Sequence, residues 1–217
     1  FGSEHPASRK STSTPGGRNS LGFSSLPEDG ERFPAALRIR YFLLEQVLFV
    51  SLEPSKMLMA TDGERQRMEV DGTGFIQALE VLQRENQEHF EEGQAHALEA
   101  IPKVEKFEVI RVDDKPALKA HLRGGFAINA EQLSLGEQRA MGLALLSYQF
   151  PTGALLCIEC PENGLHPSMI EAVAQALNRG GRIQLLIITH SPNWVGVTPL
   201  ERIRVCQPEA GGIRIVV

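Results

Sequence analysis

Residues 155–167, Leu-Leu-Cys-Ile-Glu-Cys-Pro-Glu-Asn-Gly-Leu-His-Pro, decide the fold class of this chain. Residues 154–159 form an apolar strand that ends on an acid, and a helix with a proline in its first turn is expected to follow over residues 167–179. A second, largely apolar strand covers residues 183–189. Continuous apolar strands separated by helices are typical of a parallel sheet that is covered on both faces, so the sequence predicts an α/β fold.

A further helix is expected to begin at Ser134 and to run to about Gln149. Glu137 follows Ser134 by three residues, which is the spacing of a capping box. The Ser-x-Gly start also offers a hydroxyl, free backbone N–H groups and the positive end of the helix dipole, which together suit an anion. The pattern alone therefore leaves both an ordinary helix cap and an anion site open.

Between residues 75 and 128 the pattern changes. Apolar residues at helical spacing predict one helix that begins near Phe75 and another over residues 87–100. Three short strands separated by Asp-Asp and Gly-Gly turns predict an antiparallel meander over residues 106–112, 117–122 and 126–128.

Strand-like patterns also occur near both ends of the chain. Residues 37–41 alternate apolar and polar side chains with the period of a strand, and Pro54 ends an apolar run over residues 47–52. Strands at residues 203–206 and 213–217 would extend an edge of the main sheet.

Composition limits the possible classes of protein. The 217 residues are 42% hydrophobic and 23% charged, and their net charge of −5 argues against a protein that coats nucleic acid. No apolar run approaches the ~18 residues of a membrane helix, and no signal-peptide pattern is present. Three cysteines are too few for a disulfide scaffold, so we expect a cytoplasmic protein. Residues 1–34 are rich in Ser, Gly and Pro, and we expect them to form a flexible arm.

The ends of the two apolar strands carry the candidate chemistry. Glu159 closes the first strand, and a carboxylate in this place lies where open α/β sheets bind ligands and can hold Mg²⁺. His190 follows the second strand and could donate a hydrogen bond to a phosphate oxygen. Each residue also has a plainer interpretation. Glu159 could be an acid that simply reaches solvent, and His190 could be a structural histidine.

Taken in order, these segments resemble the C-terminal half of ABC-type ATPases and, more closely, the RecF/SMC-like AAA ATPases, including the OLD and phage-defence groups. Residues 133–138 resemble the signature motif of that family, residues 155–167 its Walker B segment with the D-loop, and residues 188–192 its switch-histidine segment. Residues 52–57 and 71–74 are similar to the middle region of the family. The resemblance extends over roughly residues 50–206.

The resemblance implies a P-loop NTPase-like (ABC ATPase-like) parallel sheet flanked by helices. Residues 35–217 would form the C-terminal lobe of the ATPase domain, and residues 73–128 a small insertion of helices and antiparallel strands. The cofactors would be ATP and Mg²⁺. The partner would be a second copy in a head-to-tail dimer or another ATPase subunit, with DNA or an effector protein as further partners and no membrane.

The resemblance also assigns roles to single residues. Ser134 and Gly136 would contact the γ-phosphate of an ATP held mainly by the opposite subunit, and Glu137 would belong to the same cofactor-binding segment. Glu159 would position Mg²⁺, and His190 would sense the γ-phosphate.

Four further residues would act at the dimer interface, and one at the catalytic position. The dimer interface would be crossed by Asn163, Gly164, Leu165 and His166, which would link the two sites. Cys160 occupies the position where the family usually has the Glu that polarises the attacking water. A thiol replaces that carboxylate poorly, so we expect hydrolysis to be slow or absent.

A second departure from the family is the P-loop. The sequence contains no Gly-x-x-x-x-Gly-Lys-Ser/Thr string, and the nearest candidate, residues 15–20, has no lysine. We therefore expect either a C-terminal piece of a longer ATPase or a protein that has lost this lobe, and weak ATP binding by the isolated chain. A nucleotide-independent dimerisation module, or a subunit that donates signature residues to a P-loop-bearing partner, remains the alternative.

Cys157 and Cys160 form a Cys-x-x-Cys pattern, which elsewhere marks zinc or redox sites. Residues three apart on a strand point to opposite faces, so the two thiols could meet at one metal only if the strand ended between them. A small buried apolar residue is the simpler interpretation of Cys157.

Overall fold

The computed structural model describes residues 29–59, 61, 63, 65, 67–179 and 183–216. The chain divides into two compact units, residues 1–45 and residues 46–217. Most of the arm that we expected at residues 1–34 lies outside the described residues, which begin at Asp29.

The described part of the first unit is helical. Helix α1 (Pro34–Tyr41) is followed by a π-helical turn, η2 (Phe42–Gln46), which ends at the start of the second unit. The strand that we predicted over residues 37–41 is therefore wrong. Proline in the first turn and the Ala, Leu and Arg residues of this segment all favour a helix, and five alternating residues are too few to outweigh them.

The second unit contains the predicted parallel sheet. Strands β1 (Val47–Val50), β5 (Leu155–Glu159) and β6 (Gln184–Ile188) pair in parallel in the order β1-β5-β6. The register places Cys157 of the central strand between Phe49 and Leu186. The fold class and the assignment of these three strands are thus confirmed.

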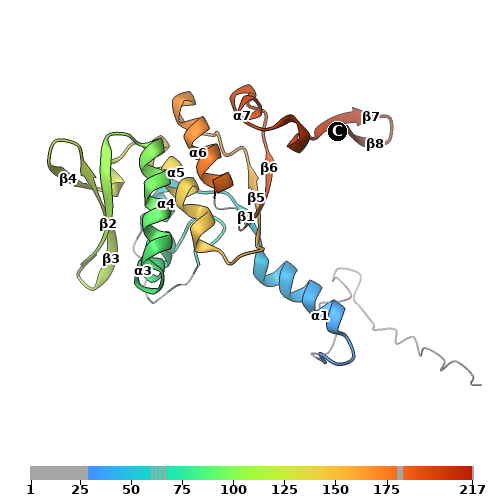
Figure 1. Cartoon of the computed structure of the whole chain (residues 1–217), viewed down its shortest axis with the longest axis horizontal. Coiled ribbons are helices and arrows are strands. Elements are labelled where there is room, and N and C mark those ends of the chain that lie inside the picture. Colours follow the sequence, from blue (N-terminus) through green and yellow to red (C-terminus); the bar gives the residue numbers. More distant parts are fainter. Residues whose placement is uncertain are drawn as a thin grey trace, which may run out of the picture. The chain divides into compact units, whose positions relative to one another are not determined.

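The helices form a layer beside this sheet, and a second sheet lies beyond them (Figure 1). That second sheet is the predicted antiparallel meander, and the predicted helix over residues 87–100 has the expected bounds. The helices are α2 (Pro54–Met57), α3 (Phe75–Glu85), α4 (Gln87–Ala100), α5 (Leu135–Leu146), α6 (Pro167–Arg179) and α7 (Pro192–Gly196), with 3-10 turns η3 (Ala130–Gln132), η4 (Ser147–Gln149) and η5 (Leu200–Arg202). The meander strands are β2 (Val104–Val112), β3 (Lys115–Leu122) and β4 (Phe126–Asn129).

Helix α5 lies at the centre of the core. It contacts α4 and α6, and nearly all of its residues after the first turn are buried, including Met141 and Leu145. One face of the parallel sheet, which carries Leu156 and Ile158, packs into the same core. This packing fixes the start of α5 relative to the sheet.

The last two strands form a separate hairpin. Strands β7 (Val205–Glu209) and β8 (Gly212–Val216) pair with each other in antiparallel fashion, not with the parallel sheet, so the predicted extension of that sheet is wrong. Gly211, at a φ of +96°, makes the tight connection that favours this local pairing. Among the described residues, no helix is both long and apolar enough to span a bilayer.

Candidate functional site

The carboxyl ends of the three parallel strands lie at one edge of the sheet. Glu159 is the last residue of β5 and stands opposite Ile188, the last residue of β6, two positions before His190. The two residues that the sequence places at the ends of apolar strands therefore lie on neighbouring strand ends. Both residues are exposed, so a carboxylate and an imidazole are available to a ligand at this edge.

Cys160 marks the point where strand β5 becomes a turn. Its φ of +45° is left-handed, which is unusual for a residue with a side chain. Its N–H donates to the carbonyl of Ile188 (2.7 Å), and its carbonyl accepts from the N–H of Asn163 (3.0 Å). The backbone at the catalytic position of the family pattern is therefore held on both sides.

The strand ends between the two cysteines of the Cys-x-x-Cys pattern. Cys157 is buried, and burial raises the pKa of its thiol, whereas Cys160 is only half-buried. Within the described residues, no group of three or more His, Cys, Asp and Glu side chains could hold a metal. For Mg²⁺ shared with a nucleotide, the exposed Glu159 carboxylate at the strand end offers a fitting oxygen ligand.

Glu162 connects the turn after β5 to the segment after β6. Its Oε1 accepts a hydrogen bond from Thr189 Oγ1 (2.7 Å) and another from the N–H of His190 (3.3 Å). Sequence reasoning missed this contact. The neighbours of Glu162 are 27 and 28 positions away in the chain, so no local pattern could have shown it.

The start of α5 has the predicted capping box. Glu137 N–H donates to Ser134 Oγ, and both the N–H and the hydroxyl of Ser134 donate to Glu137 Oε2, while Lys103 pairs with Oε1 at 2.9 Å. Burial by itself raises the pKa of Glu137, but Lys103 and Ser134 outweigh it and hold that pKa below its usual value. The carboxylate is thus engaged within the chain, while Ser134 itself is exposed.

Gly136 brings the start of α5 against the turn that follows β5. A Cβ at this position would lie 2.6 Å from the carbonyl oxygen of Gly164, which is too close for any side chain. Gly164 itself has a φ of +76°. The signature-like segment and the D-loop-like segment are therefore in direct backbone contact.

Asn163 and His166 belong to the same turn. Both are exposed, and Asn163 contributes its N–H to the turn as described above. His166 Nδ1 accepts a hydrogen bond from the N–H of Ser168 (3.3 Å), in the first turn of α6, and lies 2.8 Å from Ser168 Oγ. These two residues are available to a partner at the surface.

Arg139 and Lys56 are residues of this region that sequence reasoning missed. A guanidinium nitrogen of Arg139 donates to the carbonyl of Leu52 (3.0 Å), which joins α5 to the end of β1. Burial lowers the pKa of Arg139, and the nearby Cys160 and Glu162 oppose that effect. Arg139 follows the quoted signature by one position, so its place in the motif was the available signal.

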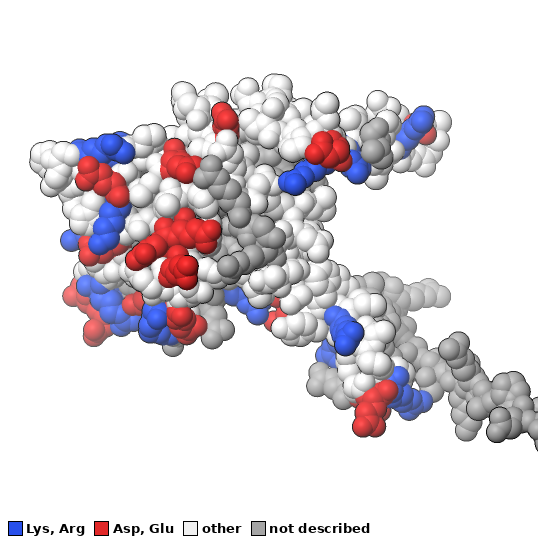
Figure 2. Space-filling view, viewed as in Figure 1, with Lys and Arg blue, Asp and Glu red and all other residues white. Residues whose placement is uncertain are grey.

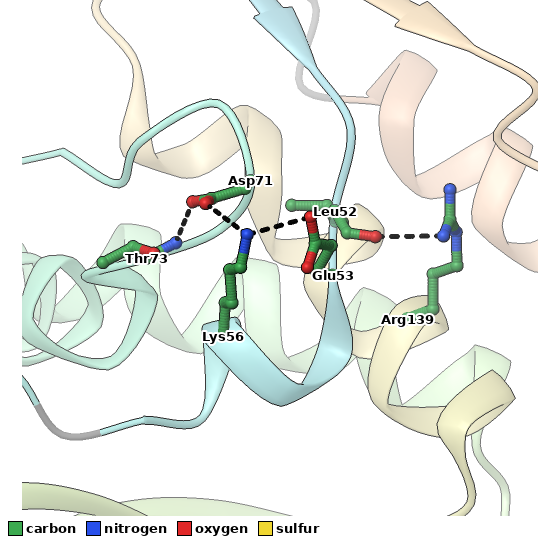
Figure 3. A network of polar contacts seen from close by, with 6 residues as sticks. All are labelled: Leu52, Glu53, Lys56, Asp71, Thr73 and Arg139. Carbon is green, nitrogen blue, oxygen red and sulfur yellow. Dashed lines mark hydrogen bonds and ion pairs between the residues drawn. The ribbon is translucent and has the colours of Figure 1, made fainter.

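Lys56 joins the two segments that resemble the middle region of the family (Figure 3). Its ammonium lies 3.0 Å from Glu53 Oε1 and 3.0 Å from Asp71 Oδ2. The N–H of Thr73 donates to Asp71 Oδ1 (3.0 Å), and this bond together with Lys56 lowers the pKa of Asp71 to about 2. Residues 52–57 and 71–74 therefore form one structural unit.

The chain is similar to one known protein family. The family model described as "AAA domain, putative AbiEii toxin, Type IV TA system" matches residues 68–195. No curated protein matches the chain.

Two similar solved structures come from SMC proteins. One, from a study of ATP-driven dimerisation and DNA-stimulated activation of SMC ATPases, has a TM-score of 0.51 at 15% identity and covers 64% of this chain and 88% of that chain. The other, an Smc head bound to the C-winged helix domain of ScpA, has a TM-score of 0.58 at 14% identity and covers 79% of this chain. This chain spans only 55% of the second structure. At identities this low, the structural similarity shows a shared fold and nothing further.

Proposed function

This chain belongs to the AAA-domain family whose model it matches, and we propose that it forms the signature and Walker B lobe of an ATPase that binds ATP and Mg²⁺. The single observation that carries the proposal is the edge at which Glu159 and His190 stand on neighbouring strand ends. The predicted boundaries of the lobe, residues 35–217 with an insertion at residues 73–128, are part of the proposal.

In this proposal the chain's own residues contribute a metal ligand, a phosphate contact and a partner contact. Glu159 would hold Mg²⁺, which would shield the phosphate charge, and His190 would donate to the γ-phosphate. Ser134 and Gly136 would approach the nucleotide of a second subunit, because the start of α5 is exposed. Asn163 and His166 would contribute to the same head-to-tail interface.

The outer face of the parallel sheet supports a further lobe. Phe49, Leu186 and Ile188 share the face opposite to the helices and are 67%, 53% and 53% exposed. The other edge of β6 pairs with no strand among the described residues. Parallel sheets are normally covered on both faces, so we propose that a P-loop-bearing lobe, from the same polypeptide or a partner, packs on this face.

A nucleotide-binding assay tests this proposal. The isolated chain should bind ATP·Mg²⁺ weakly in calorimetry, because a P-loop supplies most phosphate contacts. Micromolar binding by the isolated chain that is lost in Glu159→Gln or His190→Ala would contradict the need for a separate P-loop. The upstream coding sequence should be read for Gly-x-x-x-x-Gly-Lys-Ser/Thr at the same time.

Dimerisation tests the second part of the proposal. In the assembly that contains the P-loop, light scattering should detect dimers that depend on ATP. Ser134→Ala should weaken these dimers while leaving ATP binding by the monomer unchanged, since Ser134 would contact only the partner's nucleotide. Equal dimerisation by the Ser134→Ala variant and the wild type would contradict the proposed head-to-tail arrangement.

Cys160 favours a second candidate function, a dimerisation or interaction module that works without nucleotide. The family pattern has its water-polarising Glu at this position, and the half-buried thiol replaces it poorly. Dimers that form equally with and without ATP·Mg²⁺ would support this candidate over the ATPase.

A further inference from the structure

Glu162 is the polar side chain that ties the two strand ends of the site together. One oxygen, Oε1, accepts both the Thr189 hydroxyl (2.7 Å) and the His190 N–H (3.3 Å). Thr189 Oγ1 in turn accepts the N–H of Ser191 at 3.0 Å. The backbone on both sides of His190 thus depends, directly or through Thr189, on one carboxylate.

The turn that carries Glu162 is itself firmly held. The N–H and the carbonyl of Cys160 are both hydrogen-bonded, as described above. The N–H of Leu165 also donates to the carbonyl of Glu162 at 3.0 Å. The backbone at Gly136 also packs so closely against the carbonyl of Gly164 that no side chain would fit between them. A carboxylate on so constrained a turn has few positions available, so it can act as a fixed acceptor.

Charge also acts on this carboxylate. Arg139 lies close enough to interact electrostatically with Glu162, and it is anchored by its bond to the Leu52 carbonyl. Glu162 Oε2 is buried and makes no hydrogen bond to any residue that the structure describes. Hydrogen bonds therefore hold one oxygen, while the attraction of a half-buried guanidinium acts on the carboxylate as a whole.

We propose that Glu162 is a positioning residue that sets where His190 leaves strand β6, and that it links His190 to the start of α5. A shift of α5 at Gly136 would move the turn at Gly164, and Glu162 would carry that movement to Thr189 and His190. The part of this inference that concerns nucleotide sensing by His190 rests on the proposed function. The structural part does not, because it concerns contacts within one chain.

Amide hydrogen exchange of the full chain, measured by NMR without nucleotide, tests the structural part. Glu162→Ala removes the acceptor of the His190 N–H, and exchange at His190 should accelerate about tenfold or more. Glu162→Gln keeps a carbonyl oxygen in the same place and should restore exchange to near the wild-type rate. The amide of Ile158, in the middle of β5, is the internal control and should not change.

Two further variants keep the test informative. Thr189→Val removes one donor to Glu162 and the acceptor for Ser191, so it should accelerate exchange at Ser191 even if Glu162→Ala does not fold. Glu201→Gln, a change of an exposed carboxylate in η5, should leave all these amides unchanged. Unaltered exchange at His190 in Glu162→Ala, or acceleration spread evenly over β5, would overturn the positioning role.

Trp194, the single tryptophan of the chain, reports on the link to nucleotide. It is buried in α7, four residues after His190. In the assembly that contains the P-loop, ATP·Mg²⁺ should change Trp194 fluorescence in wild type and in Glu162→Gln, and the change should fall at least about threefold in Glu162→Ala. A full response in Glu162→Ala would overturn the link. If ATP·Mg²⁺ changed Trp194 fluorescence in none of the proteins while amide exchange changed as expected, the result would contradict the proposed function. It would still support the structural role of Glu162.

Discussion

The two sheets of the second unit present opposite kinds of outer face. Beyond the helices, β2 and β3 turn Lys106, Glu108, Lys119 and His121 outward, and Glu108 Oε2 lies 2.8 Å from His121 Nε2. The outer face of the parallel sheet instead carries large apolar side chains that are more than half exposed, as described above. In the view of Figure 2, charged side chains gather over the helices and the antiparallel sheet and are few over β1, β5 and β6.

This difference indicates on which side of the second unit a further layer is favoured. An antiparallel sheet with one polar face can end a protein in water, whereas a parallel sheet is normally buried on both faces. The same contrast is visible in the sequence, where residues 104–112 mix charged and apolar side chains and residues 154–158 are apolar throughout. The parallel sheet is thus the side on which a further layer is expected, and its carboxyl edge is the side on which chemistry is expected.

The largest effect should come from restoring a carboxylate at that edge. In the assembly that contains the P-loop, Cys160→Glu should raise steady-state phosphate release by about 10²–10⁴-fold, the usual contribution of a positioned base. Cys160→Gln is the matched control, because it has a similar size but cannot take a proton. Equal rates for the Glu and Gln variants, with ATP binding confirmed, would mean that Cys160 is not at the catalytic position.

A charge placed on each outer face tests the contrast between the two sheets directly. Leu186→Asp should weaken packing of the P-loop-bearing lobe about 100-fold, because an apolar contact is lost and a carboxylate is buried. Val112→Asp, at a similarly exposed position on β2, is the matched control and should have no effect. The measurement is a dissociation constant for separate chains, or an unfolding temperature for a single polypeptide. Equal effects of the two changes would show that the parallel face is an ordinary surface.

Backbone contact at the carboxyl edge should be sensitive to a single methyl group. Gly136→Ala forces the Gly164 carbonyl to move and should lower the free energy of unfolding in urea by about 1–2 kcal/mol. Gly196→Ala, where nothing lies within 4 Å of the added carbon, should change it by no more than a few tenths of a kcal/mol. A Gly136→Ala variant as stable as wild type would show that the turn at Gly164 yields easily.

The sequence predicted the elements whose ends carry strong local signals. Pro167 at the start of α6 and the Ser134–Glu137 capping box are short-range features, and both helices begin where these features place them. The strand expected over residues 37–41 was wrong because a short alternation carries less information than a proline and several good helix formers. Continuous apolar strands separated by a helix predicted the parallel sheet, and the order of the motifs carried the family resemblance.

The candidate site was predictable in outline only. Neighbouring parallel strands placed Glu159 and His190 at one edge, since that follows from topology. The bond between the side chains of Glu162 and Thr189 spans 27 positions of the chain, and the bond from the Arg139 side chain to the Leu52 carbonyl spans 87. Such contacts arise from packing, and nothing in the local sequence marks them.

The smallest expected effect concerns Asp71, at the end of the network around Lys56. Its pKa of about 2 lies below the usual 3.8, so the folded state favours the carboxylate, and this stabilisation is present above about pH 4 and is lost as the pH falls toward 2. Asp71→Asn should therefore lower stability at pH 7 by less than about 1 kcal/mol, because the partly exposed pair is screened by solvent. It should also flatten the decline of stability between about pH 4 and pH 2.

Urea unfolding at a series of pH values measures this effect, and the antiparallel sheet supplies its control. Glu108→Gln removes the partner of His121 on the polar outer face, where both side chains are 38% exposed, and it should leave stability at pH 7 unchanged within error. The two carboxylates have lowered pKa values for similar reasons, a hydrogen bond to a neighbouring donor. They differ in what they hold: Asp71 joins residues 52–57 to residues 71–74 beside the carboxyl edge, whereas Glu108 joins adjacent strands that are already paired. A Glu108→Gln variant that loses as much stability as Asp71→Asn would show that the polar face is as tightly organised as the edge of the parallel sheet.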